Sequence, residues 1–138
     1  LELTVDGQPQ TIRRTVRKSG QTYSVRLNPS SVNGKPVRIK QIFRTQTPQW
    51  GHRLFFELPQ PARDMALTMD YTNTEIADMR VSDTVATSRP ARVSRTPESV
   101  PGRVISVEAS GWLLPKTGFA FTWTLETELP QTEKSEAD

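Results

Sequence analysis

Apolar residues alternate with polar ones along most of this chain, most clearly near its C-terminal end. From Phe119 to Leu125, bulky apolar side chains occupy every second position, and Ala or Thr occupies the positions between them. A period of two is typical of a strand with one buried and one wetter face. A turn is predicted just before this strand, with Pro115 near its start and Gly118 in a left-handed conformation. The pattern predicts a β-hairpin with residues 112–114 as its first arm.

The same period recurs in short segments that are separated by turns rich in Gly, Pro and Asn. The predicted strands lie near residues 1–5, 10–18, 22–27, 37–45, 53–58, 65–71, 79–85, 91–95 and 104–109, ahead of the hairpin. No segment shows the sustained 3.6-residue period of an amphipathic helix. About nine short strands predict an all-β, antiparallel β-sandwich of immunoglobulin-like architecture, with a β-barrel as the second choice.

The length of the chain, 138 residues, is enough for one compact domain with one core. We expect a single sandwich domain over residues 1–129 and a disordered polar tail over residues 130–138. Apolar residues make up 34% of the chain, which fits a thin two-layer structure with many exposed Thr, Ser and Arg side chains. No run of about twenty apolar residues exists, so no transmembrane segment is expected in this sequence.

Cysteine is absent, which excludes disulfides, thiolate metal sites and cysteine nucleophiles. A cysteine-free chain is compatible with the cytosol, the periplasm or the exterior. The chain begins at Leu1 rather than Met, and we therefore expect a fragment of a larger membrane-anchored, exported or multi-subunit protein. On this ground an exported or membrane-attached location is slightly favoured over a cytoplasmic one.

Positive charge is concentrated in the first half of the chain. Residues 1–60 contain ten Lys or Arg against three Asp or Glu, whereas residues 61–138 contain eight against twelve. In a meander, residues of the same parity on adjacent strands lie side by side. Five basic residues are expected to share a face in this way: Arg13, Arg17, Arg26, Arg38 and Lys40. Such a face indicates a polyanion or an acidic protein partner, unless these outward positions simply carry Arg and Lys.

Trp50 and Trp112 are candidates for contact with a ligand or a partner. Each lies beside a glycine in or near a predicted loop, where an aromatic ring can stay exposed and stack on a sugar or dock into a partner. Packing over an open end of the sandwich is the alternative role for Trp50. Trp123 differs from both, because its phase assigns it to the core.

No set of residues in the sequence converges on a catalytic or metal centre. His52 is the only histidine, and no Gly-x-Ser-x-Gly motif offers it a nucleophile. Asp70, Asn73 and Asp78 are weak candidates for a metal site, because they belong to the densest group of oxygen ligands. Their spacing does not match a helix–loop–helix calcium site, and capping of turns and pairing with arginines is the alternative role.

These observations favour a non-catalytic β-sandwich interaction module that mediates protein–protein contacts, through loops or by strand addition at a sheet edge. The alternative is a β-domain that binds a ligand or polyanion (nucleic acid, nucleotide or an anionic surface) through the basic N-terminal half. A carboxylate-based hydrolase using Asp70 with Glu57 or Glu108 comes third. No cofactor is expected, since the glycines are scattered singly at turns and form no phosphate-binding loop.

Overall fold

The computed structural model describes residues 1–28, 34–48, 50–84 and 89–130, so all but the first residue of the predicted tail lies outside the described residues. Regular structure in these residues is almost entirely β-strand, and the strands pair in antiparallel fashion. The strands belong to two compact units, the N-terminal unit (residues 1–48) and the sandwich unit (residues 49–138). The single domain expected over residues 1–129 remains a prediction. The described residues contain no helix long and apolar enough to cross a membrane.

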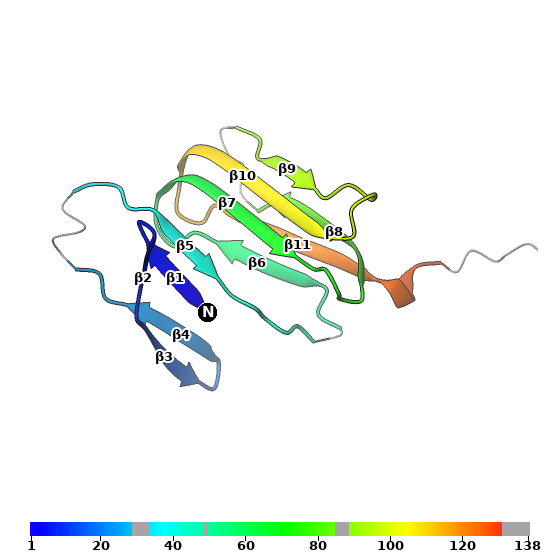
Figure 1. Ribbon diagram of the computed structural model, residues 1–138, viewed down its shortest axis with the longest axis horizontal. Helices are drawn as coiled ribbons and strands as arrows, with labels where there is room; N and C mark the ends of the chain where they lie inside the picture. Colours follow the sequence, from blue (N-terminus) through cyan, green and yellow to red (C-terminus); the bar gives the residue numbers. More distant parts are fainter. Residues whose placement is uncertain (29–33, 49, 85–88, 131–138) are drawn as a thin grey trace, which may run out of the picture. The chain divides into compact units, whose positions relative to one another are not determined.

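The sandwich unit consists of two three-stranded antiparallel sheets (Figure 1). Its strands are β6 (Arg53–Glu57), β7 (Ala62–Asp70), β8 (Ile76–Asp83), β9 (Arg92–Arg95), β10 (Val104–Leu113) and β11 (Gly118–Leu125), and a short 3₁₀ helix (Glu126–Glu128) follows. One sheet has the order β7-β10-β9 and the other the order β6-β11-β8. The all-β, sandwich-like fold predicted from the sequence is confirmed. The sheets of the described residues are open, so the closed barrel that was the second choice is not seen.

One hydrophobic core draws its side chains from both sheets. Ile105 and Val107 of β10 belong to the same buried cluster as Phe119 and Phe121 of β11, and none of the four is more than 2% exposed. These two strands are the middle strands of their sheets, so neighbours flank them on both sides. Each fully buried side chain of this size stabilises the fold by about 1.5–3 kcal/mol. The core of the sandwich unit therefore depends mainly on β10 and β11.

Residues 112–125 do not form the hairpin that the sequence pattern predicts. β10 and β11 are consecutive in the chain, yet β10 pairs with β7 and β9, whereas β11 pairs with β6 and β8. The connection, residues 114–117, therefore crosses from one sheet to the other. The hairpin prediction was wrong because a period of two reveals that a strand has an inner and an outer face, but contains no information about which strand lies beside it.

The crossing connection is attached to the end of β6. The Leu58 amide donates a hydrogen bond to the Thr117 carbonyl, and the Lys116 amide donates one to the Leu58 carbonyl, both at 2.9 Å. The Lys116 ammonium also lies 2.9 Å from Glu57 Oε1. β6 is therefore held in two ways: its side pairs with β11, and its C-terminal end is hydrogen-bonded to the crossing connection.

Gly118 has a different role from the one that the sequence predicts. Lys116, with a φ of 72°, takes the left-handed conformation that was assigned to Gly118. Gly118 instead begins β11 at a point where the backbone of β6 approaches closely. A Cβ at this position would overlap the carbonyl oxygen of Phe56, and only glycine lacks this atom.

The N-terminal unit contains a three-stranded sheet and a separate hairpin. The sheet has the order β2-β1-β5, and the hairpin joins β3 to β4. The strands are β1 (Glu2–Val5), β2 (Gln8–Pro9), β3 (Ile12–Arg17), β4 (Gly20–Val25) and β5 (Ile39–Ile42). Val5 is the only fully buried apolar side chain among the described residues of this unit. The unit therefore has almost no core of its own, and so little buried apolar surface rarely stabilises a fold of this size.

We expect Gly118→Ala to destabilise the sandwich unit by about 1–3 kcal/mol, the usual cost of overpacking a tightly packed position. Gly102→Ala is the matched control, because a Cβ there meets only Thr72 Oγ1, at an ordinary contact distance of 3.9 Å. Chemical denaturation followed by tryptophan fluorescence measures both variants. Equal free energies of unfolding for the two would contradict the close approach of β6 and β11.

Candidate functional site

Three of the predicted basic residues lie in or directly after the β3–β4 hairpin. Arg13 and Arg17 alternate in phase along β3 and pair with Ser24 and Gly20 of β4. Arg26 follows β4 in the same phase as Ser24. All three basic side chains are exposed. The register therefore places Arg13 and Arg17 on one face of the hairpin, whereas Arg26 lies just beyond the end of β4, and its place on that face stays a prediction.

The other two predicted basic residues belong to a different sheet. Lys40 lies in β5 and pairs with Thr4 of β1. Arg38 precedes β5, and its amide donates a hydrogen bond to Asp6 Oδ1 at 2.8 Å. Because β5 pairs with β1 and not with the hairpin, Arg38 and Lys40 share no sheet with Arg13.

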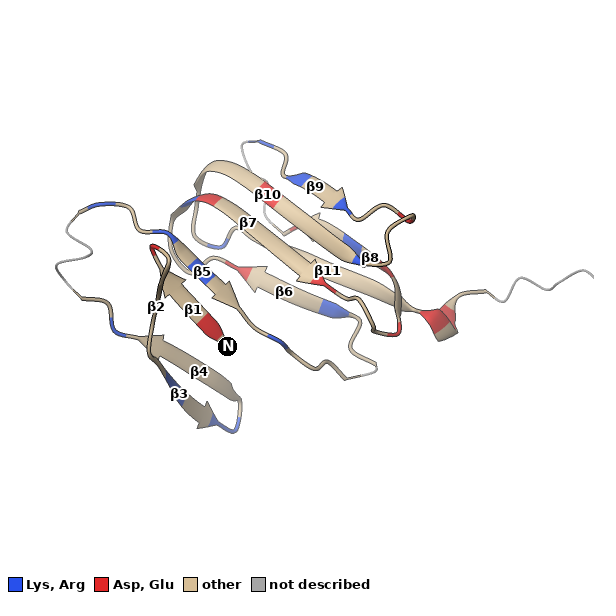
Figure 2. Cartoon of the chain, in the orientation of Figure 1, with Lys and Arg blue, Asp and Glu red and all other residues tan. Residues whose placement is uncertain are grey.

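The β3–β4 hairpin is unusual in two respects: it carries only positive charges, and no other strand of the described residues pairs with it. Residues 12–26 contain five Lys or Arg and no Asp or Glu, and Figure 2 shows blue on β3 and no red on either strand of the hairpin. The face opposite Arg13 carries Arg14 together with Val16 and Tyr23, which are 62% and 45% exposed. Within the described residues β3 and β4 pair only with each other, so each has one unpaired long edge.

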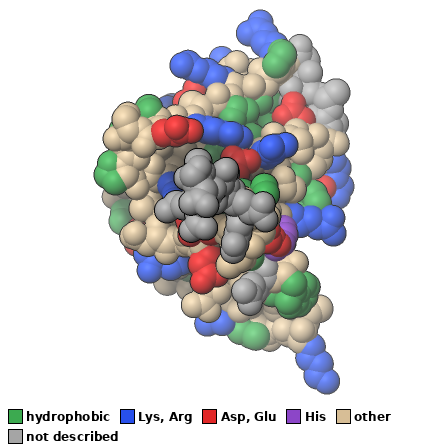
Figure 3. All heavy atoms as spheres, turned by 90° about the vertical axis from the view of Figure 1, so that its right-hand side faces the viewer, with side chains coloured by type: hydrophobic (Ala, Val, Ile, Leu, Met, Phe, Trp, Pro, Cys, Tyr) green, Lys and Arg blue, Asp and Glu red, His purple; other side chains and the backbone are tan. Residues whose placement is uncertain are grey.

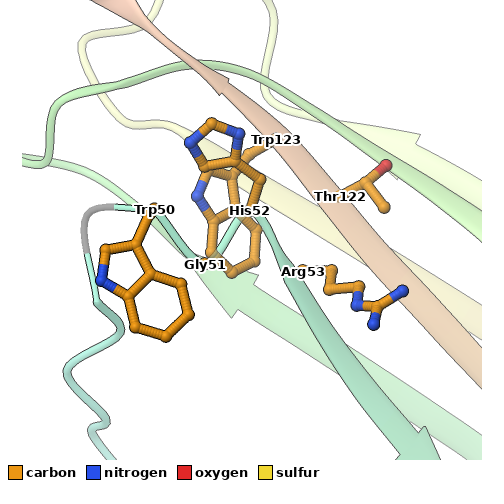
Figure 4. Close-up of a pocket in the computed structure, with 6 residues that line it drawn as sticks. All are labelled: Trp50, Gly51, His52, Arg53, Thr122 and Trp123. Carbon is orange, nitrogen blue, oxygen red and sulfur yellow. The ribbon is translucent and has the colours of Figure 1, made fainter.

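Trp50 lies beside a hollow in the sandwich unit, which we call the tryptophan hollow (Figure 4). It has a volume of about 440 Å³ and is lined by Trp50, Gly51, His52, Arg53, Thr122 and Trp123. The antiparallel register of β6 and β11 brings these residues together, since Arg53 pairs with Thr122. Trp50 is 84% exposed, whereas Trp123 is 8% exposed and belongs to the core, as its phase predicts.

His52 is held at the hollow by its backbone and by its ring. Its carbonyl accepts a hydrogen bond from the Trp123 amide at 3.1 Å. Its Nε2 lies 3.3 Å from Glu128 Oε1, while Glu128 Oε2 accepts a hydrogen bond from the Leu125 amide at 2.8 Å. Figure 3 shows the histidine, in purple, at the surface beside acidic side chains. A pair exposed to this extent contributes about 0–1 kcal/mol to stability, so its main effect is to orient the ring.

Of the residues that line this hollow, the sequence pattern singled out only Trp50 as a binding residue. The run of an aromatic, a histidine and an arginine within residues 50–53 was the one feature of the sequence that could have indicated the others nearby. Thr122 and Glu128 lie far along the chain from them, and only the pairing of β6 with β11 brings them near.

Trp112 lies on the outer face of the other sheet, at a β-bulge. The register of β10 against β7 shifts just before Trp112, and Gly111 at the shift has a φ of 85°. The Gly111 amide donates a hydrogen bond to Asp64 Oδ1 at 2.7 Å, which ties the bulge to β7. Trp112 pairs with Arg63 and is 72% exposed. The two candidate tryptophans therefore lie apart in the fold, since Trp50 is in the loop before β6 and Trp112 is in β10 of the other sheet.

Asp70, Asn73 and Asp78 have local structural contacts. The Thr72 amide donates a hydrogen bond to Asp70 Oδ1 at 2.9 Å, and Asn73 takes a left-handed φ of 58° in the turn after β7. Asp78 Oδ2 lies 3.2 Å from Arg80 Nε. Among the described residues, no group of three or more His, Asp or Glu is placed to hold a metal ion. These contacts correspond to the turn-capping and ion-pairing alternative.

The carboxylates considered for a hydrolase do not face one another. Glu57 lies in the sheet opposite Asp70 and Glu108 and is 2.9 Å from the Lys116 ammonium. Asp70 and Glu108 share a sheet, where they pair with Val104 and Ala66. This register separates them by four residues along the strands, or about 13 Å. Glycosidase carboxylates are about 5–9.5 Å apart, so Asp70 and Glu108 are too far apart for this chemistry, and Glu57 lies in the other sheet.

Comparison with known proteins found no match to this chain among protein-family models, curated proteins or solved structures.

Asp70 makes the stability of the sandwich unit depend on pH. Hydrogen bonds from Thr72, first from its side chain and then from its amide, lower the pKa of the Asp70 carboxyl below its ordinary value of 3.8. A lowered folded-state pKa contributes stability that is present above the unfolded-state pKa and is lost as pH falls through the folded-state pKa.

We therefore expect the wild type to be more stable than Asp70→Asn at neutral pH, and the difference to close as the pH falls below about 3.8. Denaturation of both proteins at a series of pH values measures the difference. A difference that stays constant across this range would contradict the assignment.

Proposed function

We propose that this chain is a non-catalytic interaction module whose N-terminal unit binds a partner protein by strand addition to the β3–β4 hairpin. The observation that carries the proposal is the combination of unpaired strand edges with dense positive charge in this hairpin. An exposed edge presents unpaired N–H and C=O groups, and an added strand satisfies them. An added strand also stabilises a two-stranded hairpin, which is marginal alone in water.

The charge of the hairpin indicates the partner segment that fits. Five Lys or Arg without any Asp or Glu favour an acidic segment, and charge complementarity of this kind raises the association rate and the specificity. Side chains of an added strand alternate between the two faces. A segment of alternating acidic and apolar residues therefore places its carboxylates beside Arg13 and Arg17 and its apolar side chains beside Val16 and Tyr23.

The scarcity of buried residues in the N-terminal unit also supports a partner. Several large apolar side chains of this unit are between 45% and 62% exposed: Val16, Tyr23, Ile39, Ile42 and Phe43. Covering apolar surface stabilises a complex by about 25 cal/mol per Å² before the costs of association. A partner segment on the hairpin would thus supply buried area that the unit lacks.

In this proposal the sandwich unit is an immunoglobulin-like carrier. Immunoglobulin sandwiches combine strands B, E and D in one sheet and strands C, F and G in the other. With β7 taken as strand B, the order β7-β10-β9 corresponds to B-E-D, and β8 and β11 correspond to C and F. β6 then takes the place of strand G, although it comes from the N-terminal side of the unit. This correspondence supports the immunoglobulin-like label.

We expect a synthetic peptide of alternating Glu and Val to bind the full chain, and Arg13→Glu/Arg17→Glu to weaken binding at least about tenfold, or about 1.4 kcal/mol. Isothermal titration calorimetry measures the affinities. The matched control is Arg63→Glu/Arg92→Glu, which places the same charge change in the sandwich unit.

A second peptide with N-methyl groups on alternate residues tests the strand itself, because it keeps the side chains but removes ladder donors along one edge. We expect this peptide to lose binding. Unchanged affinity of the methylated peptide would reject strand addition, and equal losses for the two charge-reversal variants would reject the hairpin as the site.

Polyanion binding is a second candidate function, and it is supported by the same absence of acidic residues in the hairpin. The two candidates differ in salt dependence, because binding to a polyanion releases counterions and weakens steeply with salt. Titration of duplex DNA at increasing ionic strength is the test. A steep salt slope that Arg13→Glu/Arg17→Glu reduces, together with no binding of the peptide, would replace the first proposal by the second.

A further inference from the structure

We propose a second binding site in the sandwich unit: the tryptophan hollow binds a saccharide. Its volume of about 440 Å³ falls within the size range of small-molecule sites, about 300–1,000 Å³. The hollow lies wholly within the sandwich unit and uses no residue of the hairpin.

Trp50 presents an exposed indole beside Trp123, which is buried in the core. Trp50 is 84% exposed, so a large flat apolar face is in contact with water, while Trp123 at 8% exposure is fixed in the core. Figure 4 shows the Trp50 indole at one side of the hollow and Arg53 and Thr122 at the other. A ligand in the hollow therefore covers an aromatic face while it meets polar side chains.

The polar groups of the tryptophan hollow are held in place before any ligand binds. The backbone of His52 is hydrogen-bonded to β11, and its ring is oriented by Glu128, which is itself bonded to the Leu125 amide. The Arg53 guanidinium lies over the Phe55 ring, with 5.2 Å from its Cζ to the ring centroid. Groups that are already ordered lose less entropy on binding, which favours affinity.

A saccharide is the ligand class that uses both features. A pyranose ring has an apolar C–H face, which the negative face of an indole attracts, and a rim of hydroxyl groups that donate and accept hydrogen bonds. His52, Arg53 and Thr122 together offer donors and acceptors for such a rim. A wholly apolar ligand would form no hydrogen bonds with these side chains, and a small inorganic anion would leave the indole uncovered.

The hollow is suited to binding and not to hydrolysis of the glycosidic bond. Hydrolysis requires two carboxyl groups on opposite sides of that bond. None of the six lining residues is acidic, and the nearby Glu128 carboxylate is bonded through both oxygens, to His52 and to Leu125. A saccharide would thus be retained unchanged, in agreement with a non-catalytic module.

The test is a screen of the full chain against an array of neutral and uronic-acid-containing oligosaccharides, followed by calorimetry with those that bind. We expect binding by the wild type and a loss of at least about tenfold for Trp50→Ala. Trp112→Ala is the matched control, because Trp112 is also largely exposed, at 72%, but lies on the other sheet, and we expect it to leave the affinity unchanged. Thr122→Val keeps the shape of the side chain without its hydroxyl and should weaken binding by a smaller factor.

Circular dichroism verifies that each variant is folded. No binding to any oligosaccharide on the array, or equal losses for Trp50→Ala and Trp112→Ala, would overturn the proposal. Binding of a proline-rich peptide at Trp50 in place of any sugar would overturn the ligand class. Arg13→Glu/Arg17→Glu should leave saccharide binding intact, so this site and the hairpin fail or succeed separately.

Discussion

The packing of β10 against β11 across the sandwich core is the interaction on which the rest of the sandwich unit depends. Each is the middle strand of its sheet, and the alternation of large apolar side chains sends one face of each strand inward. The crossing connection then bonds to the end of β6, and Gly118 allows β6 to approach β11. β6 in turn brings Trp50 and His52 beside Thr122. The tryptophan hollow is therefore a consequence of how the core is built.

The N-terminal unit, in contrast, buries almost no apolar surface. Its strands have the same period of two, yet Val5 is its only fully buried apolar side chain among the described residues. One face of its hairpin carries Arg13 and Arg17, the other carries Arg14, Val16 and Tyr23, and neither β3 nor β4 pairs with another strand among the described residues. A segment with little core and unpaired edges would gain stability from an added strand, and for this reason the proposed partner surface is placed here rather than on the sandwich.

Sequence reasoning succeeded where a property is local. The period of two located most strands and the all-β class, and the phase of Trp123 assigned this residue correctly to the core. It failed where a property depends on pairing. The predicted hairpin at residues 112–125 proved to be a crossing between sheets, and the five basic residues proved to be divided between two sheets. Parity along a strand predicts the face of a residue but not its neighbours.

The sequence by itself determined the inner and outer faces of the two central strands of the sandwich, the concentration of positive charge in residues 12–26 and the absence of cysteine chemistry. Only the tertiary structure decided which strands pair, why position 118 must be glycine, and which side chain orients His52. The physical reason is that side-chain alternation is a property of a few consecutive residues. Strand pairing is decided by the burial of apolar surface between segments far apart in the chain, and no single segment contains that information.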